Sequence, residues 1–364
     1  MDKSKNAQIP ISQPVSTKKE KEDLYNVPNS TASNFVLEVI GAGENVADLP
    51  ARKKQVNHNT KIEVLEDKNR RQISLVNEKA EVTIELSDIE KLAGSNKPAK
   101  KLFILTMIKA NEQAIYNGQL VKDHISFPLQ ELVDIGFYKS PVSARVGFNS
   151  GMNALTSIKL KGKIQRSKKS NSYIDALEVL FTGARIKNGQ CTIFFNDRIN
   201  WGFMAQYFTV LPPYYFKLSN RASDLLYYIF FLARQHTKDI EEREYFTIGF
   251  RAIQHRLQLP SEKENKDPGR TIRQPIEDAI EQIETEHSML YHNMEFSLLP
   301  IYDDAAPITD FLDNGYLKVS LKGNFANSFI GLSKDATKKI EAAQKRQEKI
   351  IEKAIIAKVA KNVE

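Results

Sequence analysis

Hydrophobic and polar positions follow a clear helical period in the stretch KLSNRASDLLYYIFFLARQ, residues 217–235. Ser219 or Asn220 can cap the start of this helix, because a short side-chain oxygen accepts hydrogen bonds from the free amides of the first turn. The pattern therefore predicts a helix that is buried on most sides and that forms the centre of a domain. Its apolar stripe repeats at i, i+1, i+3, i+4, i+7 and i+8 and consists of Leu225, Leu226, Tyr228, Ile229, Leu232 and Ala233, with Tyr227, Phe230 and Phe231 filling much of the rest.

The residues after this helix alternate between strand and helix patterns. YFTIG (245–249) predicts a short strand, and FRAIQHRLQL (250–259) predicts a short helix with Phe250, Ile253 and Leu257 inward. After a polar turn at 260–269, the stretch 269–287 has the period of an amphipathic helix. A hairpin from SMLYH and MEFSLLPIY, a loop at 303–315 and a strand YLKVSLKG complete the unit. The inward positions of the amphipathic helix are Ile272, Ile276, Ala279, Ile280 and Ile283.

An earlier stretch, 96–195, predicts the same order of elements. Pro98 starts a long helix, HISF (124–127) is a short strand, and Pro128 opens a short helix that Gly136 ends. A second helix is expected over 140–158, although Gly147 and Gly151 weaken it. Two strands follow, 174–186 and 189–195, joined by a hairpin turn at 187–189. Both halves thus run long helix, short strand, short helix, turn, second helix, hairpin; they share order and spacing rather than residue identity.

These patterns divide the chain into six segments of an α+β protein. Residues 1–58 are expected to be a flexible tail, because their composition buries too little apolar surface to offset ordering. A short β-rich segment (59–95) precedes the first unit (96–197), and an aromatic linker (198–217) leads to the second unit (218–330). Residues 331–364 predict a basic C-terminal helix. This helix is expected to be solvated, although a partner-binding role is the alternative.

Composition narrows the functional classes. The 364 residues carry a formal charge of +7 and a pI of about 9.1, which leans toward polyanionic partners. Cys191 is the single cysteine, so the chain has no internal disulfide and no multi-cysteine zinc site, and its place in an alternating strand suggests a core residue. No apolar run reaches membrane-spanning length, and the N-terminal residues show no signal core. We therefore expect a cytoplasmic protein with no membrane partner.

Candidate DNA-binding residues of the second unit gather where its second helix begins. Arg, Gln and Thr at such a position can contact base edges, and a lysine in the preceding turn can contact a phosphate. Acids further along the helix would repel phosphates, so only the first turn and a half is expected to face DNA. An ordinary charged surface is the alternative. The candidates are Lys266, Arg270, Thr271, Arg273 and Gln274.

The first unit offers two further groups of candidates. On its second helix, asparagine can form two bonds with adenine, although Asn and Gly here are also typical of a turn. Beyond the helix, six cations in eleven residues exceed what protects a sheet edge, and we expect this run to form a strand and a mobile tip that contacts phosphates. The helix candidates are Ser143, Arg145, Asn149 and Asn153, and the run consists of Lys159, Lys161, Lys163, Arg166, Lys168 and Lys169.

Signatures of enzymes are missing from the sequence. No G-x-x-x-x-G-K-[ST] motif occurs, and the histidines form no His-x-His pair. Tyr227 and Tyr228 fall in the buried helix. Asp303, Asp304, Asp310 and Asp313 fall in a loop that is expected to be solvated, with cation binding as the alternative. The chain is therefore expected to be no enzyme and to need neither a metal nor a cofactor.

Several of these stretches resemble a known family. KLFILTMIKANEQ, ISFPLQELVDIGFY, FNDRINWGFMAQYFTVLPPYYFKLSNRASDLLYYIFFLARQ and YFTIGFRAIQHRLQL are similar in order to bacterial plasmid replication initiators with two tandem winged-helix domains. The resemblance covers roughly residues 96–322. It implies a protein that binds double-stranded DNA at origin repeats and recruits host replication proteins such as a helicase. It also implies homodimers that repress their own promoter and monomers that initiate. Gly147 and Gly151 depart from a clean recognition helix in the first unit (96–197), so dimerisation is an alternative to DNA contact for that unit, whereas DNA binding is expected of the second (218–330).

Two other functions stay open at this point. A transcription regulator would use the same DNA chemistry without opening an origin. A nickase or primase would act through a tyrosine or through the aspartate loop.

Overall fold

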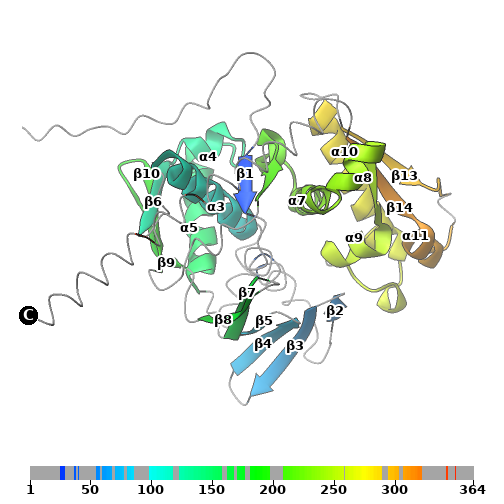
Figure 1. The fold of residues 1–364 in the computed structure, drawn as a ribbon, viewed down its shortest axis with the longest axis horizontal. Helices are drawn as coiled ribbons and strands as arrows, with labels where there is room; N and C mark the ends of the chain where they lie inside the picture. Colours follow the sequence, from blue (N-terminus) through cyan, green and yellow to red (C-terminus); the bar gives the residue numbers. More distant parts are fainter. Residues whose placement is uncertain are drawn as a thin grey trace, which may run out of the picture.

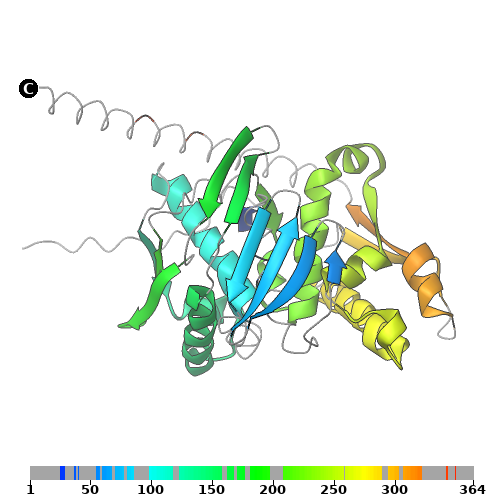
Figure 2. The same cartoon turned by 90° about the horizontal axis from the view of Figure 1, so that it is seen from below.

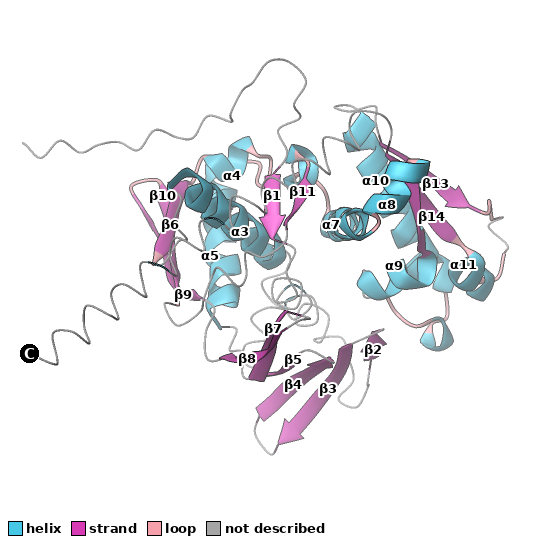
Figure 3. Cartoon of the chain, in the orientation of Figure 1, coloured by secondary structure: helices cyan, strands magenta, loops and turns pink. Residues whose placement is uncertain are grey.

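The protein combines helices with small antiparallel sheets, an α+β architecture (Figure 3). The computed structural model describes residues 25–28, 37, 40, 55–57, 60–67, 70–77, 80–85, 98–117, 123–157, 162–167, 170–176, 181–196, 208–257, 259–288, 294–302 and 306–321, with the single positions 342 and 349. Apart from positions 342 and 349, the expected C-terminal helix (331–364) lies outside these ranges, as do the first part of the aromatic linker and most of the N-terminal segment.

The first unit begins with three helices and one strand, and a β-hairpin follows later in the chain (Figure 1). They are α3 (Pro98–Asn117), β6 (His124–Pro128), α4 (Glu131–Asp134) and α5 (Pro141–Ser157), and the hairpin is formed by β9 (Phe181–Lys187) and β10 (Gln190–Phe195). The strands form an antiparallel sheet in the order β6-β10-β9. Helices α3 and α5 pack together, and α5 also packs on β9. The buried contacts include Phe103, Phe148, Leu155, Phe181 and Ile193.

The hairpin of this sheet has the turn that the sequence predicts. Asn188 and Gly189 have φ values of 52° and 74°, the left-handed conformations that a two-residue hairpin turn requires. The strand expected over 174–186 is wrong, however. Its first residues belong to β8 (Ser170–Ala176), which pairs in a different sheet from β9.

Helix α5 runs unbroken through the two glycines that were expected to weaken it. At Gly147 the ring of Tyr138 lies so close to the backbone that a Cβ atom would collide with it. The glycine thus lets an aromatic side chain pack on the helix, and that contact offsets the lower helix propensity. The preceding α4 begins at Glu131 rather than at Pro128, and Gly136 with φ of 74° follows its end.

The second unit is built around α7 (Asn220–Gln235). Its N-cap is Ser219, and the Ser219 hydroxyl accepts a hydrogen bond from the amide of Ala222 at 3.3 Å. Sequence analysis predicted this cap and the buried stripe correctly, since Leu225, Leu226 and Ile229 are buried. The elements that follow are α8 (Thr237–Arg243), β12 (Tyr245–Gly249), α9 (Phe250–Arg256), η2 (Glu262–Glu264), η3 (Gly269–Arg273), α10 (Gln274–Ser288), β13 (Met294–Leu299), α11 (Ile308–Asn314) and β14 (Tyr316–Leu321).

The sheet of the second unit has the order β12-β14-β13. The inward faces predicted for α9 and α10 are confirmed, since Phe250, Ile253, Ile276 and Ile280 are all buried. The loop expected over 303–315 is wrong, because α11 occupies most of it and buries Phe311 and Leu312. Strand β13 pairs along its length with β14. The remainder of the expected SMLYH hairpin lies outside the described residues.

A six-stranded antiparallel sheet lies below the two units in Figure 1 and in front of them in Figure 2. Its order is β2-β3-β4-β5-β7-β8, so the β-rich segment before the first unit joins the hairpin that follows α5. Its new strands are β2 (Gln55–Asn57), β3 (Thr60–Asp67), β4 (Arg70–Asn77), β5 (Ala80–Glu85) and β7 (Gly162–Ser167).

The junction between the units uses residues from the expected N-terminal tail. Strand β1 (Tyr25–Pro28) pairs with β11 (Phe208–Leu211), and the Tyr25 ring meets Phe216 edge-on at 5.8 Å. Leu37 and Ile40 are also buried. The expectation of a flexible tail is therefore wrong at these positions, because an apolar core formed by distant parts of the chain is available to cover them.

Lys101 on α3 of the first unit forms hydrogen bonds across this junction. Its Nζ donates to the backbone oxygens of Phe216 (3.1 Å) and Leu218 (2.5 Å), the first in η1 (Pro213–Phe216) and the second just before α7. Burial lowers the pKa of Lys101 to about 8, although Asp224 acts against this shift. The neighbouring Lys100 pairs with Asp224 of α7 at 2.6 Å.

Candidate nucleic-acid interface

Helix α5 presents one side to solvent, and that side carries no acid. None of its 17 residues, PVSARVGFNSGMNALTS, is Asp or Glu. Arg145, Asn149 and Asn153 are all exposed and follow one another at intervals of four residues, so they form one row on the helix surface. Beside them Val142 and Val146 are 74% and 65% exposed. The three predicted positions are thus brought together on one face.

Ser143, the fourth predicted residue of this helix, has a different place. Its hydroxyl accepts from the amide of Ser140 at 3.1 Å and donates to the Ser140 carbonyl at 2.8 Å. Ser140 in turn accepts from the amide of Ser143 at 3.2 Å. These bonds cap the first turn of α5, so Ser143 orients the helix rather than extending from it.

The hairpin next to α5 adds two cations that sequence analysis did not select. Arg185 and Lys187 are exposed on β9. The Arg185 guanidinium lies 5.2 Å from the centroid of the Phe194 ring, which supports it in an extended position. Their alternation next to the Asn188-Gly189 turn was the sequence signal for this pair.

The basic run itself does not form the hairpin beside α5. Lys163 and Arg166 lie on β7, in the six-stranded sheet, where Lys163 is the register partner of Asp175 on β8. Lys159, Lys161, Lys168 and Lys169 lie outside the described residues. The expected strand is confirmed over 162–167, and phosphate contact by the run stays a prediction.

In the second unit, exposed candidates cluster at the start of the second helix, as predicted. Lys266, Arg270 and Gln274 are exposed. Arg270 has 75% of its side chain exposed and its Nε lies 3.3 Å from Asp267. Such a solvated pair contributes little to stability, so Arg270 can turn toward another anion at small cost.

Thr271 and Arg273, by contrast, are occupied within the unit. The Thr271 hydroxyl donates to the Asp267 carbonyl at 2.7 Å and accepts from Asn265. Arg273 is only 12% exposed and pairs with Glu277 at 2.8 Å. It also donates to the Tyr302 carbonyl at 3.1 Å and lies over the Phe311 ring. These contacts join η3 to α11 and its preceding loop, which makes Arg273 a structural residue in this conformation.

The rest of α10 is acidic on its exposed side. A shallow hollow of about 270 Å³ is lined by Asp278, Glu281, Gln282, Thr285 and Glu286. Burial raises the pKa of the nearby Glu284, and repulsion from Glu281 acts in the same direction. This acidic face disfavours contact with a phosphate backbone, and the expectation that only the helix start faces DNA stays a prediction.

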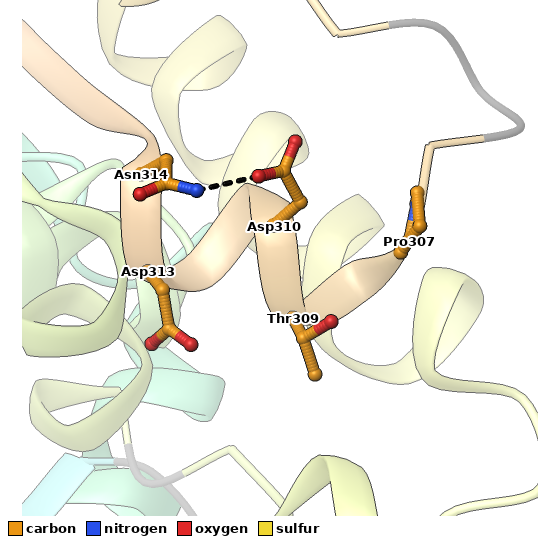
Figure 4. Close-up of a pocket in the computed structure, with 5 residues that line it drawn as sticks. All are labelled: Pro307, Thr309, Asp310, Asp313 and Asn314. Carbon is orange, nitrogen blue, oxygen red and sulfur yellow. Dashed lines mark hydrogen bonds between the residues drawn. The ribbon is translucent and has the colours of Figure 1, made fainter.

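Two of the aspartates expected in a loop, Asp310 and Asp313, lie on α11 (Figure 4), and Asp303 and Asp304 lie outside the described residues. Asp310 and Asp313 line an open hollow of about 450 Å³ together with Pro307, Thr309 and Asn314. Asp310 accepts from Asn314 at 2.5 Å, and Asp313 pairs with Arg251 at 2.5 Å. Within the described ranges, no three His, Cys, Asp or Glu side chains gather as a metal site requires.

Of the candidate nucleophiles, Tyr227 and Cys191 are buried, and Tyr228 is partly buried. Tyr227 is 1% exposed, and burial raises the pKa of its phenol. Burial also raises the pKa of the Cys191 thiol to about 12, so this group stays protonated at neutral pH. The expectation of a core position for Cys191 is confirmed.

Comparison with known proteins gives no family and only distant structural neighbours. No family model matches the sequence, and no curated protein matches it. The crystal structure of RctB domains 2-3 covers 78% of this chain and 98% of its own, with 9% identity and a TM-score of 0.38. Selenomethionine derivatives of domains 2 and 3 of RctB cover the same shares, with 8% identity and a TM-score of 0.40. Neither similarity is close enough to carry a functional argument. Among the described helices, none is long and apolar enough to cross a membrane.

Proposed function

We propose that this protein binds double-stranded DNA sequence-specifically through two winged-helix units, with α5 as the principal base-contacting helix. The observation that carries the proposal is the acid-free exposed face of α5 beside a hairpin with exposed Arg185 and Lys187. A helix of this kind fits the major groove, and cations on the neighbouring hairpin neutralise phosphates.

The strand orders support the winged-helix assignment. In both units the first strand precedes two helices, the last strand lies in the middle of the sheet, and the second strand lies at its edge. This order leaves the second helix outside the sheet and places the hairpin next to it. Two units with one topology also fit the order similarity of the two halves of the sequence.

The biological role that we propose is initiation of plasmid replication. It is supported by the resemblance of residues 96–322 to plasmid initiators. This resemblance covers both halves and the aromatic linker between them. Binding to origin repeats, recruitment of a host helicase, homodimer formation and repression of the protein's own promoter are parts of the same proposal, as is a non-enzymatic mode of action in the cytoplasm.

A footprint on the DNA that flanks the gene tests the proposal directly. The full chain should protect several directly repeated sites, with affinity that falls steeply as salt rises, because phosphate contacts release counterions. Protection of one promoter operator, together with normal plasmid maintenance in cells that lack the protein, would assign a transcription regulator instead. Absence of any protection would overturn DNA binding itself.

A covalent adduct between protein and DNA, or a primer made with the purified chain, would replace the proposal by a nickase or primase function. The burial of Tyr227 and the engaged carboxylates of α11 lead us to expect neither product.

A further inference from the structure

Helix α5 exposes an unusual combination of side chains. Val142 and Val146, 74% and 65% exposed, are two of the four large hydrophobic residues that are exposed in the described part of the chain. They lie one helical turn apart and therefore form a continuous apolar strip. Asn149 and Asn153 extend the exposed face toward the end of the helix, and Arg145 lies between the two valines in sequence.

We infer that this face recognises A·T base pairs in the major groove, with Val142 and Val146 on thymine methyl groups and Asn149 and Asn153 on adenine. The inference rests on the proposed DNA binding and names the base pairs that the first unit prefers. It also gives the two valines a role in specificity.

The chemistry of base edges leads to this assignment. Thymine alone among the four bases presents an apolar methyl group in the major groove, and adenine presents an acceptor and a donor that match the two polar atoms of an asparagine amide. Guanine is most often contacted by Arg or Lys, and cytosine by an acid. The face of α5 has one arginine and no acid, so its chemistry is chiefly that of A·T pairs.

Charge decides between DNA and a protein as the occupant of this face. An apolar strip alone would also suit a second copy of the chain. The acid-free helix, Arg145, and the exposed Arg185 and Lys187 on the adjacent hairpin form surroundings that attract a polyanion and repel their own copy. Duplex DNA is therefore the occupant that we propose.

The first experiment is selection of binding sites from a random duplex library by the full-length chain. The selected site is expected to contain consecutive A·T pairs. Substitutions on the exposed face of α5 should remove the preference for A·T at some of these positions. Each thymine of the selected site is then replaced by uracil, which removes only the methyl group. The affinity of the wild-type protein should fall about fourfold when a contacted thymine is replaced, because burial of one methyl group contributes about that factor to binding.

Protein variants connect that loss to particular side chains. Val142→Ala and Val146→Ala should bind the thymine site more weakly and should show little further loss with uracil. Ile301→Ala is the matched control, because Ile301 is an aliphatic residue with 92% exposure in the second unit. It should retain the full fourfold response. The same comparison is made with 7-deazaadenine, which lacks N7, in place of each adenine. This replacement should lower the affinity of the wild-type protein about tenfold and that of Asn149→Ala or Asn153→Ala much less.

Different failures point to different errors. No binding to any duplex overturns the proposed function together with this inference. Specific binding to a G·C-rich site, or binding with no response to uracil and deazaadenine, overturns only the assignment to α5. A change in sedimentation of Val142→Ala and Val146→Ala with unchanged DNA affinity would assign the strip to self-association, which also overturns the inference.

Discussion

Helices α5 and α10 occupy the same place in the two units and have opposite surfaces. Each follows a short helix, lies outside a three-stranded sheet and precedes the edge strand of that sheet. Helix α5 has no acidic residue, whereas α10, QPIEDAIEQIETEHS, has five. The hairpin beside α5 is short and carries exposed cations, whereas the strands that follow α10 are separated by the acidic α11.

This contrast shows that two units with the same topology can have different surface chemistry. The inward residues of both helices satisfy the same packing need, and the outward residues are free to differ. In the second unit only the helix start, with Arg270 and Gln274, suits DNA. The first unit is therefore expected to supply most base contacts, and the second a smaller number from one turn.

The largest expected effect comes from removing the exposed row of α5. The triple variant Arg145→Ala, Asn149→Ala and Asn153→Ala should bind its specific site at least about a hundredfold more weakly, because each lost base contact costs roughly 1–3 kcal/mol. Fluorescence anisotropy with the footprinted site measures the loss, and circular dichroism verifies the fold. The matched double variant Arg270→Ala and Gln274→Ala should lose less. A greater loss from this double variant would reverse the comparison.

A smaller effect separates two neighbouring arginines of the second unit. Arg273→Ala should lower the free energy of unfolding by about 1–3 kcal/mol, because a partly buried ion pair and a bond to a carbonyl are lost. Arg270→Ala, at a side chain with 75% exposure, should change it by less than about 0.5 kcal/mol. Urea titration measures both. Equal losses would show that the contacts of Arg273 with Glu277 and Tyr302 are not maintained in solution.

The smallest expected effect tests the acids of α10. The variant Asp278→Asn, Glu281→Gln and Glu284→Gln should bind DNA about two- to threefold more tightly at low salt, and the gain should vanish at high salt, because exposed charges are screened there. Binding measured over a salt series provides the test. Weaker binding would mean that these acids hold a part of the interface in place.

Local features of the fold were predictable from sequence. The Ser219 cap, the apolar stripes of α7 and α10, and the Asn188-Gly189 turn each depend on residues within a few positions of one another. The four-residue spacing of Arg145, Asn149 and Asn153 places them on one side of a helix, although the sequence left a turn open at these residues.

Features that depend on distant residues were missed. Arg273 looks like a helix-start cation in sequence, but its partners include a carbonyl at Tyr302 and a ring at Phe311. The continuous strand pattern over 174–186 gave no sign that β8 and β9 belong to different sheets, because sheet partners come from other parts of the chain. The exposure of Val142 and Val146 was also missed, because aliphatic residues one helical turn apart usually lie on the buried side of a helix.

Strand β1 gives synthesis of this protein a fixed order of events. On the ribosome Tyr25 emerges long before Leu211, its partner in the β1–β11 ladder. The first unit thus stays without this contact until the segment that leads into the second unit has been made. A polypeptide that ended between β10 and β11 would leave the β1 backbone without its ladder partner and the Tyr25 ring without Phe216, so proteolytic separation of the two units would remove contacts from the first unit.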